Sequence, residues 1–266
     1  MKSRFALMLL VLTPFLSACG ANNDAAVDPV VAPAATTEAA MPAPSPAPQA
    51  ATDAPLDPAA PTTPVAAPSG PAPVAGVDYV EIPNGQPYAP LNGQVEVAEV
   101  FGYTCGGCAQ FEPVVNAWKA RQPADVRFSP VPAAFGGYWV PYARAFFAAE
   151  ILGLQEKTHD AMFNAVHVAR TLPVQGVTPE QLGEFYAQHG GDAKAFVAAY
   201  NSFGIESKLN RAKQFAMRSN VQSTPTLVVN GKYTVQVTES GGYDKMLTTV
   251  DHLVAQERAA MAGGAQ

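Results

Sequence analysis

The spacing of apolar residues changes twice between residues 94 and 131. Residues 94–101, QVEVAEVF, are rich in valine and roughly alternate in polarity, which predicts a strand. Residues 108–122 instead place apolar side chains at helical spacing, and Pro113 inside this predicted helix should kink it. Residues 125–131, DVRFSPV, again have the pattern of a strand. We therefore expect a strand–helix–strand unit whose two strands pair in parallel.

The region from about residue 139 to residue 220 changes character, because five helical patterns follow one another there without a strand between them. One of these helices has a clear start signal at Thr178, with Pro179 at the first helical position and Gln181 completing a capping box. This succession predicts a helical subdomain inserted into an α/β core.

Extended patterns return in PTLVVNGKYTVQV, where Asn230-Gly231 separates two runs and predicts a type I′ hairpin. After Gly241-Gly242 the last helix has apolar residues three and four positions apart, namely Met246, Leu247, Val250 and Leu253.

The N-terminal residues 1–18 have the pattern of an export signal. Lys2 and Arg4 precede an apolar run over residues 5–16, which is too short to span a bilayer. The run ends in Leu-Ser-Ala before Cys19, and these four residues resemble a bacterial lipobox. That resemblance implies cleavage before Cys19 and attachment of lipid to its sulfur. The alternative is an ordinary signal peptide whose cleavage site contains a cysteine.

A tether follows the predicted lipid site, so residues 19–76 divide the signal from the folded part. Residues 20–76 are mostly Ala, Pro, Thr and small polar residues, without an aromatic or basic side chain. Such a segment cannot bury enough apolar surface to fold, and its prolines favour extended conformations. We expect a simple spacer there and one domain over residues 77–266.

Charge excludes a nucleic-acid-binding surface. Without Lys2 and Arg4 the chain keeps 14 basic residues against 22 acidic ones, and five of those acids lie in the tether. The balance in the domain predicts no basic stripe for nucleic acid. No other apolar stretch is long enough to cross a membrane.

The candidate chemistry lies in the pair Cys105 and Cys108, the two cysteines that remain if Cys19 carries lipid. They follow a predicted strand and begin a predicted helix, where unpaired N–H groups stabilise a thiolate. A redox-active pair is favoured over a metal site, which lacks further ligands, and over an inert disulfide, whose short loop stabilises little. We expect His159 and His167 to be surface residues.

Residues 99–113, EVFGYTCGGCAQFEP, together with the helical insertion and the stretch STPTLVVNGKY, resemble the thioredoxin-fold thiol:disulfide oxidoreductases. The resemblance is greatest to the DsbA family and covers about residues 95–254. It implies an α/β thioredoxin fold with an inserted helical subdomain.

The resemblance also implies a role for particular residues. Cys105 takes the position of the attacking thiol and Cys108 that of the resolving thiol. Thr224-Pro225 matches the cis-proline loop that packs against the disulfide, and Glu99 matches a buried acid that moves a proton to or from the resolving thiol. Burial of Glu99 also agrees with its apolar strand neighbours.

This chain departs from the family pattern at several positions. Gly106-Gly107 stands where the family usually has Pro-His, Thr224 stands where valine is usual, and Pro113 is more typical of thioredoxin. Because the dipeptide changes thiolate stability, the sequence leaves the direction of electron flow open.

The resemblance implies an enzyme that introduces disulfides into reduced or unfolded exported proteins and needs no bound cofactor. A quinone-linked membrane partner of the DsbB kind would restore its disulfide. We expect a monomer facing the periplasm and anchored in a bilayer through Cys19, with the outer membrane slightly favoured because Gly20 is not aspartate. The alternatives are a periplasmic reductase or isomerase and, from a different class, a copper-handling or client-binding lipoprotein.

Overall fold

The strand predicted at 94–101 is an interior strand of the sheet, β2 (Val95–Phe101). The computed structural model describes residues 68–264. The predicted signal peptide, Cys19 and the tether up to residue 67 lie outside this range. All seven residues of β2 are buried, because strands flank it on both sides and helices cover both of its faces.

Five strands form one mixed sheet in the order β1-β5-β4-β2-β3. Beside β2, its other members are β1 (Val80–Glu81), β3 (Val126–Pro132), β4 (Thr226–Val229) and β5 (Tyr233–Gln236). The expected parallel pair is confirmed, since β2 runs parallel to β3 and the other pairs are antiparallel.

The turn between β4 and β5 has the predicted type I′ geometry. Asn230 and Gly231 both have positive φ, at 48° and 68°, and the Lys232 N–H donates to the Val229 carbonyl at 2.8 Å. The two-residue edge strand β1 was not predicted from the sequence.

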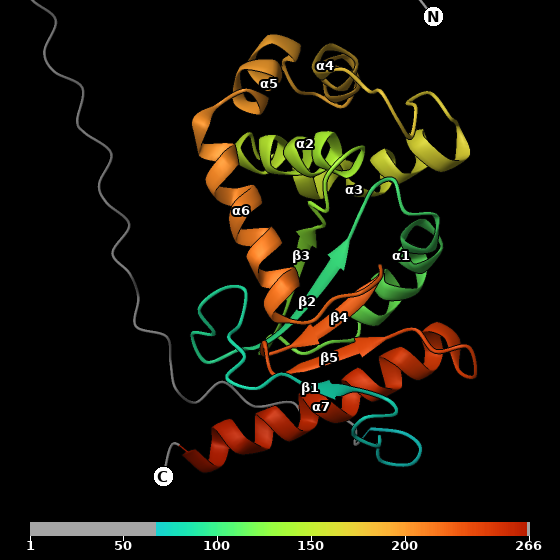
Figure 1. Ribbon diagram of the computed structural model, residues 1–266, viewed down its shortest axis with the longest axis vertical. Helices are drawn as coiled ribbons and strands as arrows, with labels where there is room; N and C mark the ends of the chain where they lie inside the picture. Colours follow the sequence, from blue (N-terminus) through green and yellow to red (C-terminus); the bar gives the residue numbers. More distant parts are fainter. Residues whose placement is uncertain (1–67, 265–266) are drawn as a thin grey trace, which may run out of the picture. The chain divides into compact units, whose positions relative to one another are not determined.

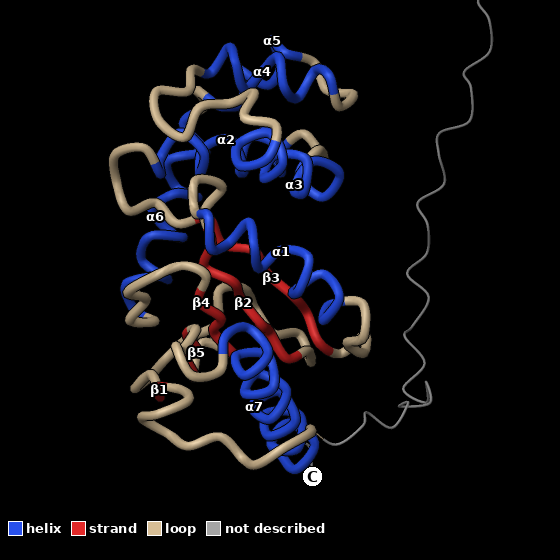
Figure 2. Tube along the Cα trace, turned by 90° about the vertical axis from the view of Figure 1, so that its right-hand side faces the viewer, coloured by secondary structure: helices blue, strands red, loops and turns tan. Residues whose placement is uncertain are grey.

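Two helices cover one face of the sheet. They are α1 (Gly106–Lys119) and α7 (Gly242–Gly264), whose apolar side chains pack with those of β2, β4 and β5. Figure 2 shows α1 and α7 beside the strands, with α6 on the other side of the sheet. Helix α1, which begins directly after Cys105, is therefore packed on the sheet beside α7.

The helical insertion is confirmed and lies beyond the ends toward which β2 and β3 point (Figure 1). It consists of α2 (Trp139–Ile151), α3 (Gln155–Phe163), a π-helical continuation (Asn164–Val168), α4 (Pro179–Gln188), α5 (Ala193–Tyr200) and α6 (Phe203–Arg218). The capping box at the start of α4 is formed as predicted.

Two glutamates in β2 are buried on opposite faces of the sheet and have different surroundings. Glu96 is paired with Arg127 at 2.9 Å and accepts hydrogen bonds from the N–H groups of Tyr88 and Ala89. Neither carboxylate oxygen of Glu99 has a partner among the described residues. A buried polar group without a partner is costly, so Glu99 requires an explanation other than stability.

The described chain before β1 contacts the last helix. His252 of α7 donates to the Ser69 carbonyl at 3.2 Å, and Lys245 of the same helix pairs with Asp78. Between residues 68 and 264, no helix has both the length and the apolar composition that a membrane crossing requires.

Candidate active site

Cys105 is the N-cap of α1, and Cys108 lies in the first turn of that helix. The extended backbone of Cys105 turns its sulfur back, so that the sulfur accepts the Cys108 N–H at 3.1 Å. Both side chains are free thiols, with Cys105 half-buried and Cys108 fully buried.

The two thiols differ strongly in acidity. A hydrogen bond with the Cys108 thiol is the main cause that lowers the pKa of Cys105 from 9.0 to about 6. The Thr224 side chain and the backbone N–H groups of Cys108 and Gly107 act in the same direction, whereas partial burial opposes them. Burial, the neighbouring Cys105 and the charge of Glu99 raise the pKa of Cys108. Only Cys105 is therefore a thiolate near neutral pH.

The Thr224-Pro225 peptide bond is cis, as predicted. It reaches the cysteine pair across the fold, because the Cys105 sulfur lies 3.4 Å from the Thr224 carbonyl oxygen. The loop also faces Gly107, where an added Cβ would lie 3.6 Å from Pro225 Cδ. A side chain at position 107 would thus fit in ordinary contact with the loop.

Glu99 is buried as predicted, on the face of β2 that α1 covers. Burial raises the pKa of its carboxyl well above 4.5, and the charges of Glu112 and Cys105 add to this effect, while Lys119 opposes it. The charge of Glu99 in turn raises the pKa of Cys108. The structure thus brings Glu99, the two thiols and the cis-proline loop together.

The expectation that His159 is a surface residue was wrong. His159 is buried, and its Nδ1 lies 2.8 Å from the Tyr103 hydroxyl while its Nε2 lies 3.5 Å from Glu112. His167 is half-buried and donates through Nε2 to the Tyr103 carbonyl at 2.8 Å.

Sequence reasoning also missed the buried Glu112, which stands four residues after Cys108. A signal was present, since Glu112 interrupts the apolar face of α1 directly beside Phe111. For His159 no local signal existed, because its partners come from the turn before α1 and from α1 itself.

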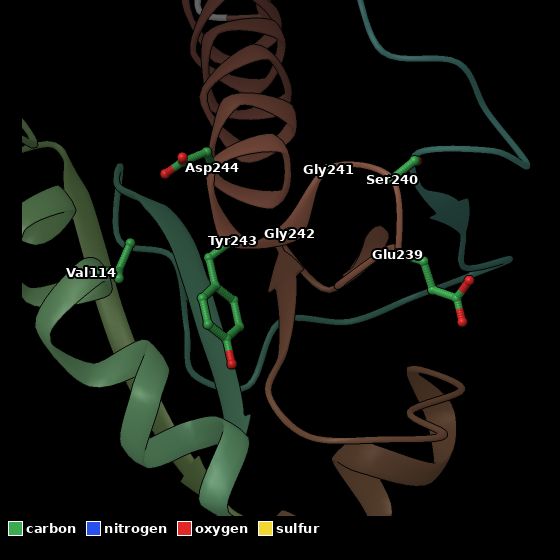
Figure 3. A pocket seen from close by; sticks show the side chains of 7 residues that line it. All are labelled: Val114, Glu239, Ser240, Gly241, Gly242, Tyr243 and Asp244. Carbon is green, nitrogen blue, oxygen red and sulfur yellow. The ribbon is translucent and has the colours of Figure 1, made fainter.

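Tyr243 supports the cysteine turn from the start of α7. Its hydroxyl donates to the Gly107 carbonyl at 2.8 Å, and its ring packs against Phe111. Beside it lies a hollow of about 420 Å³ between Val114 of α1 and the loop Glu239–Asp244 (Figure 3). An open surface therefore adjoins the redox turn.

A half-exposed sulfur with a low pKa, backed by a buried thiol that holds its proton, is suited to thiol–disulfide exchange. The protein is an enzyme of the thioredoxin-fold thiol:disulfide oxidoreductase class. Its residues 132–253 match the DSBA-like thioredoxin domain. The chain belongs to the DsbA family.

Two kinds of relatives show this membership. Thiol:disulfide interchange protein DsbA of Azotobacter vinelandii is 42% identical over 186 residues, which are 70% of this chain and 85% of the relative. The protein of the same name from Pseudomonas aeruginosa is 39% identical over 186 residues, or 70% of this chain and 86% of its own length. Among solved structures, oxidoreductase DsbA from Xylella fastidiosa superposes with a TM-score of 0.68 at 47% identity, covering 70% of this chain and 98% of that one.

Proposed function

We propose that this protein introduces disulfides into reduced exported proteins at the pair Cys105 and Cys108. A client thiolate attacks the Cys105 sulfur of the oxidised pair, which forms a mixed disulfide and breaks the bond to Cys108. A second client thiolate then attacks the client sulfur and releases Cys105 as a thiolate. The client loses two electrons and two protons, and the enzyme disulfide is reduced.

The low pKa of Cys105, about 6, is the observation that carries this proposal. A stabilised thiolate leaves readily in the last step, and it also stabilises the reduced enzyme relative to the oxidised one. Both effects favour donation of the disulfide to the client.

Glu99 is proposed as the proton donor to Cys108 when that sulfur leaves. Cys108 cannot remain charged in its buried position, as its raised pKa indicates. Glu99 is a buried acid whose raised pKa lets it keep its proton at pH values where an exposed glutamate is ionised. Its carboxylate oxygens have no competing partner among the described residues. When a disulfide is formed again, the same carboxylate accepts the proton of the Cys108 thiol.

Thr224 and Pro225 are proposed to align an extended client beside Cys105. The contact between the Cys105 sulfur and the Thr224 carbonyl places the backbone of this loop at the reacting sulfur. Because proline has no N–H, the loop presents Thr224 as its hydrogen-bonding residue there.

The surroundings of the enzyme follow from its N-terminal residues. We infer a signal peptide over 1–18, lipid on Cys19 and a tether through residue 76, which would place the catalytic domain as a monomer in the periplasm on a bacterial membrane. The lipobox-like residues before Cys19 support this, and Gly20 slightly favours the outer membrane. A quinone-linked partner of the DsbB kind is the proposed oxidant.

The equilibrium reduction potential in glutathione buffers tests the direction of exchange. A value well above the glutathione couple supports disulfide donation, whereas a value near that of thioredoxin, about −270 mV, would make the protein a reductase. Cys105→Ser is the control that cannot cycle. In a second variant, Cys108→Ser, the Cys105 thiolate should attack a client that already has a disulfide, release one client sulfur as a thiolate and remain joined to the other. A lack of such adducts would contradict the assignment of Cys105 as the exchanging sulfur.

A further inference from the structure

A chain of buried polar contacts connects the helical subdomain to the helix that carries the cysteines. His159 lies in α3, its Nδ1 is 2.8 Å from the Tyr103 hydroxyl, and its Nε2 is 3.5 Å from a carboxylate oxygen of Glu112 in α1. The side chains of His159 and Glu112 are only 9% and 6% exposed. Water therefore screens this contact poorly, and the charge of either group acts strongly on the other.

The orientation of the imidazole follows from the groups around Nδ1. The Tyr103 hydroxyl can donate to Nδ1, and the Gln155 side-chain amide also faces this nitrogen, at 3.4 Å. Nε2 has a proton both in the tautomer whose Nδ1 accepts from Tyr103 and in the charged ring, so in either form it directs an N–H at Glu112. The rings of Phe101, Tyr103 and Phe163 surround the imidazole at centroid distances of 4.9–5.3 Å and hold it in place.

Glu112 depends on this contact. Its other oxygen is buried without a partner among the described residues. Burial alone would raise the pKa of Glu112, but the hydrogen bond and charge of His159, with smaller help from Lys119 and Asp160, hold it below 4.5. Glu112 is thus a buried carboxylate that stays ionised mainly because His159 faces it.

The charge of Glu112 acts in turn on Glu99. After burial itself, it is the largest influence that raises the pKa of Glu99, ahead of Cys105, and Lys119 is the cation that opposes it. Two buried carboxyl groups of this kind share protons unequally, since ionisation of one makes ionisation of the other more costly.

We propose that His159 is a positioning residue for the redox reaction: it holds Glu112 ionised and thereby keeps Glu99 protonated, ready to supply the proton that Cys108 takes up on leaving. This inference rests on the proposed role of Glu99. It gives the helical subdomain a part in the proton transfer, although none of its residues in this chain of contacts touches the sulfurs.

The test measures the titration midpoint of Glu99 directly, from the side-chain carboxyl resonance of carbon-13-labelled glutamate. Comparison with Glu99→Gln assigns the resonance. His159→Gln should leave Glu112 without its partner, so that Glu112 takes up a proton and the Glu99 midpoint falls by about one pH unit. Glu112→Gln should lower the same midpoint without any change at His159.

The double variant decides whether the two residues act in series. If His159 acts on Glu99 through Glu112, adding His159→Gln to Glu112→Gln should shift the Glu99 midpoint no further. His189→Gln is the matched control, because His189 is an exposed histidine of the same subdomain that contacts Phe185 instead. In that variant the Glu99 midpoint should be the same as in the wild type.

A kinetic readout separates this inference from the role of Glu99. The rate at which a small dithiol reduces the enzyme disulfide, corrected for the ionisation of the dithiol, should fall as pH rises through the Glu99 midpoint. Glu99→Gln should abolish this fall; if the fall persists, the proposed role of Glu99 is wrong. If Glu99→Gln abolishes it but neither His159→Gln nor Glu112→Gln moves it, the inference about His159 is overturned and the role of Glu99 stands.

Thermal unfolding of each variant guards against a purely structural effect. Should His159→Gln fail to fold, Glu112→Gln still tests the inference, because an unchanged Glu99 midpoint in that variant would overturn it. A further shift of the midpoint in the double variant would overturn it as well.

Discussion

Cys105 and Cys108 belong to one turn of helix but to different environments. The Cys105 sulfur receives hydrogen bonds at the free end of α1, whereas the Cys108 sulfur is fully buried near Glu99, whose carboxylate oxygens have no partner among the described residues. Three residues of separation are enough for this difference, because they make nearly one full turn of helix: Cys105 stays at the open end of α1, and Cys108 lies on its buried side. The asymmetry makes one sulfur the nucleophile and leaving group and the other a proton acceptor.

The reduced protein should be stabilised by the Cys105 thiolate in a defined pH range. The folded pKa of about 6 lies below the ordinary value of 9.0, so this stabilisation is fully present above about pH 9 and is lost as pH falls through 6. The unfolding temperature of the reduced protein should exceed that of Cys105→Ser by more at high pH than at low pH. The thiolate absorbance in the ultraviolet should have its midpoint near the same value; equal unfolding temperatures throughout would contradict the pKa assignment.

Glu99→Leu should stabilise the fold while slowing disulfide exchange. Glu99 has a folded pKa raised above 4.5, so the free energy of unfolding declines as pH rises above that value. Removing the unpartnered acid should increase this free energy by about 1 kcal/mol at neutral pH and by less at acidic pH. Urea unfolding at two pH values measures this. A loss of stability at neutral pH would mean that Glu99 has a structural partner.

At the scale of the element, the N-terminus of α1 determines how strongly the thiolate is stabilised. Gly106 is the first helical residue and Gly107 the second, and neither contributes a side chain to the sulfur. The helix itself still contributes, through N–H groups that point at Cys105. The low pKa of Cys105 therefore depends first on the Cys108 thiol and then on backbone N–H groups and the Thr224 loop, without any charged side chain at positions 106 and 107.

Replacing Gly106-Gly107 by Pro-His should make the enzyme more oxidising. Proline is favoured at the first helical position, and a side chain at position 107 meets Pro225 at an ordinary distance of 3.6 Å. An imidazolium there would stabilise the thiolate further, so the reduction potential should rise by on the order of 30 mV or more, a tenfold change in equilibrium constant. Gly106→Pro alone is the control, since it adds no charge; an equal rise in that variant would contradict the electrostatic explanation.

At the scale of the whole molecule, the sheet and the helical insertion meet around the cysteine turn. The sheet supplies Glu99, the loop before β4 supplies Thr224-Pro225, and α3 places His159 against α1. If the proposed role of His159 is correct, substitutions in the insertion alter the chemistry through buried charges.

Cys19→Ser should release the enzyme from the membrane without changing its redox reaction. The lipid is proposed to join the protein to the bilayer only through this residue, far along the chain from the catalytic pair. Membrane fractionation and the reduction potential of both forms measure the two effects. Recovery of the variant in the membrane fraction would argue against lipid attachment at Cys19.

Much of the fold was predictable because its signals are local. The valine-rich run of β2, the capping box at Thr178 and the Asn230-Gly231 turn are all confirmed, and each depends on neighbouring residues only. The surface placement of His159 was wrong because burial depends on what packs against a helix, and one helical turn does not encode that.

By itself the sequence indicated the kind of chemistry, since two cysteines three residues apart at the start of a helix, without further metal ligands in the sequence pattern, favour a redox pair. Tertiary structure alone decided how that pair is tuned. The Thr224 carbonyl contacts the Cys105 sulfur although the two residues are 119 positions apart in the sequence. Glu99, Glu112 and His159 come from three separate elements, β2, α1 and α3. Acidity depends on burial and on the distance to other charges, and both arise only when distant segments pack together.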